Sequence, residues 1–443
     1  MSESTRAPHK SWGQALAVYL EPRQLIILVM GFASGLPLLL TLSTLSYWLT
    51  KVGADLTAIG FFAAVGAPYG YKFLWSPVID QVRLPVLGTF LGHRKSWLLV
   101  LQVLLAGAIY ALGMTDPALD PLATALAVLV VAFFSASQDI VIDAYRIEIL
   151  GDEEQAAGAA TTQIGYRFGL LLAGAGAIAL SDFVSWPVVF SILATCILAC
   201  AFFTLFIPEP KVRRPAFGND YGAWVNEAVV QPFREFMQRP GWVIVLLFIL
   251  FYKFGDAFSG FLANPFYVKM GFSGVEIALM TKIYGLVATM VGGVLGGVIV
   301  ARIGLFKTLM IGGILQAATN LLFTMLALRG HDLVWLGIAI TADNLAGGLA
   351  AAAFVAYLSG LCNRAFTATQ YALLSSFMAQ GRTLMSMPSG WLAKQLDWPE
   401  FWAVTAFMAI PGLILLVLLM RLYPDEKKLT TETKEDKTAE VFS

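Results

Sequence analysis

The sequence predicts an all-α integral membrane protein whose twelve transmembrane helices form two six-helix bundles. Three observations lead to this prediction: an apolar composition, twelve long apolar runs and a weak repeat between the halves of the chain. Of the 443 residues, 58% are hydrophobic and 13% are charged, against about 25% charged in an ordinary soluble domain. The net charge is zero, so we expect no nucleic-acid partner.

Apolar runs of about 20 residues are long enough to cross a bilayer as helices. The chain contains twelve, at 24–49, 56–79, 96–114, 121–144, 156–181, 186–207, 241–268, 275–300, 305–328, 332–360, 367–393 and 398–422. The polar N-terminal segment is not followed by a short apolar core and cleavage site, so we expect no removable signal peptide. The three cysteines lack metal-ligand or disulfide spacing, and we expect neither a metal nor a cofactor.

Basic residues are distributed unevenly between the two sets of loops. The loops on the side of the N-terminus hold most of them, including Arg94, Arg146 and Arg239, whereas the opposite loops hold only Lys51, Lys269, Arg329 and Lys394. Because positively charged loops remain in the cytoplasm, we expect both termini to be cytoplasmic.

The spans and loops divide the chain into five parts. We expect a cytoplasmic segment at 1–22, an N-terminal six-helix bundle at 23–207, a cytoplasmic linker at 208–240, a C-terminal six-helix bundle at 241–422 and a polar cytoplasmic tail at 423–443. The linker contains an amphipathic stretch at 221–238, which is typical of an interfacial helix.

The two halves resemble each other at three places. YWLTKVG (47–53) resembles FYVKMG (266–271), Arg167 matches Arg382 in the fifth and eleventh spans, and QD (138–139) matches DN (343–344) in the fourth and tenth. A repeat in which both halves have the same orientation is typical of the major facilitator fold. The expected mechanism is alternating access, in which one bundle rocks against the other.

Asp139 and Asp143 lie in the fourth span, four residues apart, and therefore share one face of the helix. An ionised carboxylate within a bilayer is costly, so these acids predict a helix that lines a polar path. No histidine lies deep in a span, so a proton-coupled cycle would need a carboxylate. Asp139, expected to face Arg167, is the first candidate for this role. Asp143 is the second, or else part of a gate.

Other ionisable and polar side chains also lie within predicted spans. The candidates for substrate binding are Lys72, Gln138, Gln163, Tyr166, Arg167, Tyr252, Lys253, Asp256, Lys282, Asn320, Asp343, Asn344 and Arg382. Arginine and lysine among them favour an anionic or zwitterionic substrate. Each is alternatively a helix–helix contact, and Lys253 with Asp256 is alternatively a structural ion pair.

A gating loop is predicted after the second span, where Asp80 is followed by GHRKSW (92–97) with Arg94 and Lys95. Asp80 is expected to accept hydrogen bonds from helix termini and arginines in one state of the cycle. A degraded copy at 292–307 lacks the acid. The alternative is a turn with basic flanks.

Several long motifs together resemble the AmpG muropeptide permeases. They are GFASGLPL (31–38), KFLWSPVID (72–80), SASQDIVIDAYR (135–146), GYRFG (165–169), YKFGDAF (252–258), GILQAATN (313–320), CNRAFTATQYALLS (362–375) and PGLILL (411–416). The resemblance implies a permease of the bacterial inner membrane that imports N-acetylglucosaminyl-1,6-anhydro-N-acetylmuramic acid, with or without its stem peptide, driven by protons. It also implies a link to β-lactamase induction in species that have that circuit.

The expected partners are an amino-sugar or peptide substrate, protons and the lipid bilayer, and the expected state is a monomer. The alternative within the same fold is a transporter of another bulky anion such as acetyl-coenzyme A. A membrane enzyme or a channel is a remote alternative, because the sequence shows no nucleophile–base pair and no metal-ligand cluster.

Overall fold

The computed structural model describes residues 17–41, 43–51, 67–212, 230–260, 262–273, 276–277, 279–386 and 388–423. Within these residues the chain forms helices joined by short connections, and none of them forms a strand. Ten helical segments in this part of the chain are long and apolar enough to cross a membrane. The predicted all-α membrane fold is therefore confirmed.

The N-terminal bundle contains the first six predicted spans. Its long helices are α2 (Pro22–Thr41), α8 (His93–Gly113), α9 (Pro121–Ile149), α10 (Gln155–Leu171) and α12 (Trp186–Thr204). Shorter elements are η1 (Val18–Leu20), α3 (Ser43–Lys51), α5 (Ala67–Tyr71), η3 (Lys72–Leu74), α6 (Ser76–Gln81), α7 (Leu87–Phe90), η4 (Asp152–Glu154), η5 (Leu172–Gly176) and α11 (Ala177–Leu180). The start of the predicted second span, at 56–66, lies outside the described residues.

The C-terminal bundle follows the short helix α14 (Gln231–Met237). Its elements are α15 (Trp242–Phe251), α16 (Phe254–Gly260), α17 (Ala263–Lys269), η7 (Leu279–Tyr284), α19 (Gly285–Ile303), α20 (Leu305–Arg329), α21 (Leu333–Gly360), η8 (Arg364–Phe366), α22 (Thr367–Ser386), α23 (Ser389–Gln395), α24 (Trp398–Phe407) and α25 (Ile410–Leu422). The predicted linker helix up to residue 229 and the tail from 424 lie outside the described residues.

The fourth span is longer than predicted. The expected span ends at residue 144, whereas α9 continues to Ile149 and so takes Arg146 and Glu148 into the helix, where both are buried. The prediction that Arg146 is a loop residue is therefore wrong. A prediction from hydropathy ends a span at the first group of charged residues. In this helix, however, those charged side chains bind other side chains in the protein interior.

Helices α9 and α21 begin in the same way but carry their acids at different depths. Asp120 caps α9 by accepting from the backbone N–H of Ala123, and Asp332 caps α21 by accepting from that of Trp335. Asp139 lies 19 residues after its cap and Asp343 only 11 after its own. At about 1.5 Å per residue, the difference is about 12 Å along the helix. The predicted match between QD and DN therefore does not hold in depth.

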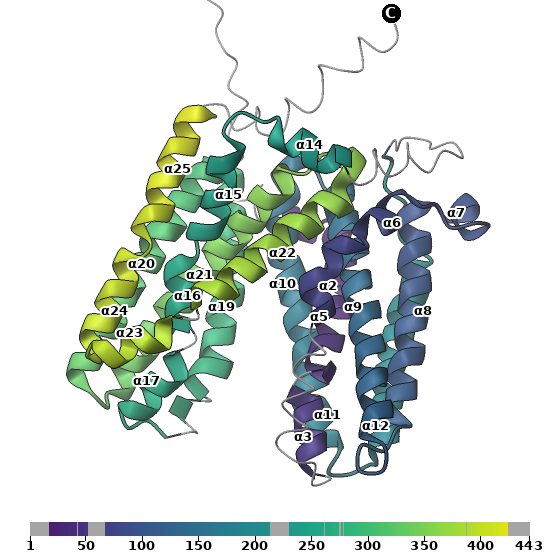
Figure 1. Cartoon of the computed structure of the whole chain (residues 1–443), viewed down its shortest axis with the longest axis horizontal. Coiled ribbons are helices and arrows are strands. Elements are labelled where there is room, and N and C mark those ends of the chain that lie inside the picture. Colours follow the sequence, from purple (N-terminus) through teal and green to yellow (C-terminus); the bar gives the residue numbers. More distant parts are fainter. Residues whose placement is uncertain are drawn as a thin grey trace, which may run out of the picture.

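The two bundles lie side by side, and their ribbons approach each other at one end (Figure 1). This end, which we call the latch side, carries α6, α7 and α14 at the top of the view. At the other end, which we call the open side and which carries α3, α11 and α17, the ribbons diverge.

The apolar packing of the described residues shows the same asymmetry. A cluster around Phe354 and Tyr357 of the C-terminal bundle includes Ile147 of α9, and a cluster around Ile140 includes Ala368 and Ala372 of α22. In contrast, the cluster around Trp48 and Phe190 contains only N-terminal residues. The cluster around Phe266 and Trp402 contains only C-terminal residues. The bundles therefore share apolar contacts on the latch side.

Small residues let the bundles approach each other closely at α10 and α19. A methyl group added at Gly297 would meet the Tyr19 hydroxyl and would lie 3.0 Å from the Ala157 Cα atom. At Gly293 it would lie 3.6 Å from the Ala160 Cβ atom. The Tyr19 hydroxyl also donates to the carbonyl oxygen of Val294 over 2.9 Å. The degraded second copy of the motif, at 292–307, thus contacts the N-terminal bundle by close packing of small residues rather than by a charged side chain.

Candidate functional site

The N-terminal charged cluster consists of Lys72, Asp139, Asp143 and Arg146, with Ser34 beside it. The hydroxyl of Ser34 on α2 donates to Asp139 Oδ1 over 2.6 Å. Lys72 and Asp143 lie within electrostatic range of the Asp139 carboxylate. A carboxylate at this depth persists where partners receive it, and the serine hydroxyl and the lysine ammonium are such partners.

Asp143 lies between two cations. Lys72 Nζ is 3.7 Å from its Oδ2 atom, and Arg146 Nη2 is 3.9 Å from its Oδ1 atom. Lys72 comes from η3, whereas Asp139, Asp143 and Arg146 all belong to α9. The side chain of Asp143 is 23% exposed and that of Arg146 only 1%. The cluster therefore extends from a solvent-accessible acid to a buried guanidinium.

Arg167 does not take the position expected for it. No ion pair joins Arg167 to Asp139 within the described ranges, because α10 packs along α2 rather than along α9. Instead, the Tyr166 hydroxyl lies within electrostatic range of Asp139. Arg167 is half-buried, and its Nε atom has no hydrogen-bond partner. Ser34 and Lys72 occupy the place beside Asp139 that was expected for Arg167.

The two glutamine candidates differ in their surroundings. Gln138 is fully buried, and its Nε2 atom donates to the carbonyl oxygen of Ala33 over 2.9 Å. This bond holds α9 against α2, so the alternative of a helix–helix contact describes Gln138. Gln163 of α10 is exposed, and remains a candidate for contact with a substrate.

The C-terminal charged cluster consists of Lys253, Asp256 and Asp343, with Gln316 and Thr319. Lys253 Nζ lies 3.5 Å from Asp256 Oδ2, and the Gln316 side-chain amide donates to the same oxygen. The Thr319 hydroxyl donates to Asp343 Oδ1 over 3.0 Å. Lys253 and Asp256 also lie within electrostatic range of Asp343. The structure thus brings together three candidates from α21 and from the junction of α15 and α16.

Two other candidates of the C-terminal bundle form hydrogen bonds of their own, and one of them, Tyr252, also lies within electrostatic range of Asp256. The buried Tyr252 donates to the carbonyl oxygen of Leu309 over 2.8 Å. Asn344 accepts from Thr289 over 2.8 Å and donates to the carbonyl oxygen of Ile340 over 2.9 Å. Asn320 is buried and Arg382 is exposed. The side chain of Lys282 lies outside the described residues.

Asp80 of α6 forms a latch between the bundles. Its Oδ1 atom accepts from Arg94 Nη2 over 2.5 Å. Its Oδ2 atom accepts from the backbone N–H and the hydroxyl of Thr369, over 3.0 and 3.1 Å. Thr369 lies in the first turn of α22, where backbone N–H groups have no intrahelical acceptor and favour an anion. Asp80 thus joins an arginine of one bundle to a helix terminus of the other.

Arg94 and Lys95 contribute to the latch in different ways. Arg94 is fully buried and donates to Glu148 from both Nε and Nη2, the latter over 2.6 Å. Lys95 contributes its backbone N–H, which donates to Glu209 over 3.0 Å, beside that of Arg94 at 2.9 Å. Glu209 thereby caps the start of α8.

Sequence reasoning missed the partners of the predicted residues. The missed partners are Ser34, Glu148, Glu209, Thr319 and Thr369. Extending the fourth span by a turn and a half would have identified Glu148 as a buried acid. Hydroxyl and amide groups carry no comparable signal, because they occur in membrane helices for many reasons.

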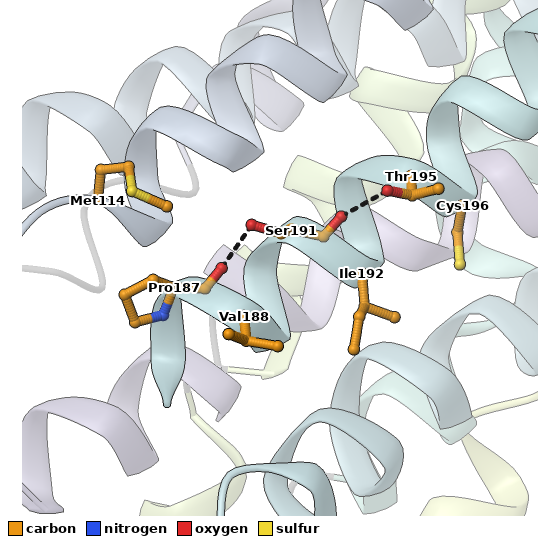
Figure 2. Close-up of a pocket in the computed structure, with 7 residues that line it drawn as sticks. All are labelled: Met114, Pro187, Val188, Ser191, Ile192, Thr195 and Cys196. Carbon is orange, nitrogen blue, oxygen red and sulfur yellow. Dashed lines mark hydrogen bonds between the residues drawn. The ribbon is translucent and has the colours of Figure 1, made fainter. Parts of the chain in front are cut away.

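Two cavities lie outside the centres of the charged clusters, and one of them is lined by Gln155 and Ser359, which accept from Arg146. One, of about 430 Å³, is an open groove at the start of α12 lined by Met114, Pro187, Val188, Ser191, Ile192, Thr195 and Cys196 (Figure 2). Its hydroxyls donate to carbonyl oxygens of their own helix, so the groove is chemically apolar. The other, of about 140 Å³, lies between the bundles on the latch side. Within the described residues, no group of three or more His, Cys, Asp and Glu side chains is placed to hold a metal ion.

Comparison with known proteins identifies relatives of the chain. The sequence profile of the Major Facilitator Superfamily matches residues 25–287 and 253–442. The anhydromuropeptide permease of Escherichia coli strain K12 is 41% identical over 407 residues, which are 91% of this chain and 81% of the permease.

Solved structures with low sequence identity share the fold. The proton:xylose symporter XylE superposes with a TM-score of 0.66 at 12% identity, covering 96% of this chain and 99% of the symporter. The human organic anion transporter MFSD10 superposes with a TM-score of 0.63 at 13% identity, covering 92% and 100%. This shared fold, together with the family profile and the permease relative, shows a multi-pass membrane transporter rather than an enzyme.

Proposed function

The chain belongs to the anhydromuropeptide permease family of the Major Facilitator Superfamily, and on that premise we propose that it imports anhydromuropeptides by alternating access. The cargo is the disaccharide of N-acetylglucosamine and 1,6-anhydro-N-acetylmuramic acid, with or without a stem peptide. The observation that carries the proposal is that 41% identity to the Escherichia coli permease extends over 91% of the chain.

The charged clusters support a cargo that combines carboxylates with amide and hydroxyl groups. Lys72 and Arg167 in one bundle and Lys253 in the other are half-buried cations. Arginine and lysine bind carboxylates by a planar fork and by a point charge respectively. Tyr166 and Gln163 add an aromatic face and an amide suited to sugar rings and hydroxyls.

The direction of transport follows from the proposed orientation. Basic loops favour a cytoplasmic location for the latch side and for both termini, in a bacterial inner membrane. In that orientation the latch of Asp80, Arg94 and Thr369 closes the cytoplasmic side. The structure then represents the state that receives cargo from the periplasm, and we propose that a monomer completes the cycle.

Proton coupling is assigned to Asp139. Asp139 lies beside the Ser34 hydroxyl and within electrostatic range of Lys72. Its charge therefore depends on whether a carboxylate of the cargo is bound to Lys72. An anion at Lys72 removes the positive charge that favours ionised Asp139, and thereby promotes its protonation. Cargo and proton would then bind together and cross together.

Uptake into right-side-out membrane vesicles tests the function. We expect saturable accumulation of labelled anhydromuropeptide that depends on an inward proton gradient and is competed by unlabelled anhydromuropeptide. Acetyl-coenzyme A serves as the competing bulky anion. If only acetyl-coenzyme A competed, the assigned cargo would be wrong. Flux that neither saturates nor responds to the proton gradient would contradict the proposal as a whole.

A further inference from the structure

Arg146 belongs to the N-terminal charged cluster, but its other contacts reach beyond that cluster to the second bundle. Its side chain, 1% exposed, lies near the latch-side end of α9, three residues after Asp143. A buried guanidinium is costly unless its donors are bonded and its charge is paired. The contacts of Arg146 therefore show what holds it in the interior.

These contacts come from both bundles. Arg146 Nη1 donates to Gln155 Oε1 over 3.3 Å in its own bundle and to the hydroxyl of Ser359 over 3.2 Å on α21. The guanidinium also lies 5.4 Å from the ring centroid of Tyr371 on α22, within the range of a cation–π contact. Arg146 thus bridges the bundle interface on the latch side.

The charge of Arg146 is balanced by Asp143, although loosely. Their nearest atoms are 3.9 Å apart, longer than the 2.7–2.9 Å of a charge-assisted hydrogen bond, and the Nη2 atom has no hydrogen-bond partner. The groups that face Asp143 are Lys72 from η3, Asp139 and Arg146 from α9, and the Tyr371 hydroxyl from α22. One carboxylate therefore balances a cation in the solvent-accessible cluster and another in the interface.

We propose that Arg146 is the coupling residue that transmits the charge of Asp143 to the bundle interface. While Asp143 is ionised, Arg146 stays between Ser359 and Tyr371 and the latch side remains closed. When Asp143 loses its charge, Arg146 is left as a buried cation without a counter-ion. The latch side then opens, because separation of the bundles exposes the Arg146 guanidinium to water. The inference deepens the proposed transport function and rests on it for its meaning in the cycle.

A native thiol can report the separation without any cargo. Cys362 is 9% exposed and lines the latch-side cavity of about 140 Å³ together with Gln155 and Ser359, the two hydrogen-bond partners of Arg146. Ile147 of the opposite bundle belongs to the same apolar cluster as Cys362. Opening of the latch side therefore exposes this sulfur.

The experiment measures maleimide labelling of Cys362 in the full-length protein in proteoliposomes, with Cys196 and Cys200 replaced by alanine. We expect Asp143→Asn to raise the labelling rate about fivefold or more, the lower range of coupling between two sites. We expect Arg146→Met to abolish that response, so that Arg146→Met and the double variant label at equal rates. Arg146→Lys, which keeps the charge, should retain part of the response.

The matched control removes a different ion pair of the same interface. Arg364 and Asp152 lie 3.5 Å apart with side chains 43% and 54% exposed, and Asp143 is not a member of this pair. In Arg364→Gln the response to Asp143→Asn should persist in full. A labelling rate that Asp143→Asn leaves unchanged, or a response that survives Arg146→Met, would overturn the proposal. Failed uptake with a preserved labelling response would instead count against the transport function alone.

Discussion

The two charged clusters have similar chemistry but different connections to the rest of the molecule. In each cluster a hydroxyl donates to one carboxylate and a lysine pairs with another. The N-terminal cluster uses Ser34 with Asp139 and Lys72 with Asp143, and the C-terminal cluster uses Thr319 with Asp343 and Lys253 with Asp256. The third partner differs: the charged Arg146 contacts Asp143, whereas the neutral Gln316 contacts Asp256.

This difference separates two roles that the sequence did not distinguish. Arg146 connects the N-terminal cluster to the bundle interface, whereas Gln316 keeps the C-terminal cluster within its own bundle. The N-terminal acid also lies about 12 Å further along its helix toward the latch side. We therefore expect the N-terminal cluster to couple cargo binding at Lys72 to the conformational change, and the C-terminal cluster to contribute cargo contacts without driving that change.

Replacing the two hydroxyl-bonded acids one at a time gives the largest expected contrast. Asp139→Asn should abolish gradient-driven accumulation while leaving equilibrative exchange, because the amide cannot gain a proton. Asp343→Asn should keep the gradient response and raise the Michaelis constant about tenfold, as for the loss of one charged acceptor. Vesicle uptake with and without a pH gradient measures both. The opposite pattern, with coupling lost only at Asp343, would reverse the comparison.

The latch provides a second contrast, between closure by charge and closure by packing. Asp80→Asn places an amide donor opposite Arg94 and the Thr369 N–H, and should destabilise the closed latch side by about 3 kcal/mol. This is the lower end for breaking a buried pair, because Glu148 still balances Arg94. Gly297→Ala should cost about 1–3 kcal/mol by overpacking against Ala157.

Labelling of Cys362 measures both latch variants, with thermal unfolding in detergent as a check on folding. Gly390→Ala is a suitable control, since a methyl group there meets no atom within 4 Å. If Asp80→Asn left the labelling rate unchanged, the latch would not be what holds this side closed.

The smallest expected effect concerns the cap of α21. The backbone N–H of Trp335 donates to Asp332 and lowers the pKa of that carboxyl. Because the folded-state pKa is depressed, the cap contributes stability above the unfolded-state pKa and loses it as the pH falls through the lowered value. Thermal unfolding between about pH 6 and about pH 3 should therefore depend less on pH in Asp332→Asn than in the unaltered protein. An identical pH dependence would exclude this contribution.

Much of the fold could be predicted from the sequence because its signals are local. Apolar runs found the spans, and the four-residue spacing of Asp139 and Asp143 identified a polar face of α9. The partners of those acids could not be predicted. Ser34 lies 105 residues before Asp139, and Thr369 lies 289 residues after Asp80. Arg146 was predicted to lie in a loop because charged residues at the end of an apolar run resemble a loop. Its place in the helix becomes clear only when the residues that bind its guanidinium are known.

The sequence by itself determined the membrane class, the two six-helix halves, the family and the presence of acids at bilayer depth. The membrane class, the two halves and the acids depend on composition or spacing along the chain, whereas the family depends on motifs that resemble those of known permeases. Only the tertiary structure decided that the bundles meet on the latch side, that Lys72 rather than Arg167 lies beside Asp139, and that Arg146 crosses the interface. A long basic side chain pairs with whichever acid helix packing brings within a few ångströms, and packing depends on residues far apart in the chain.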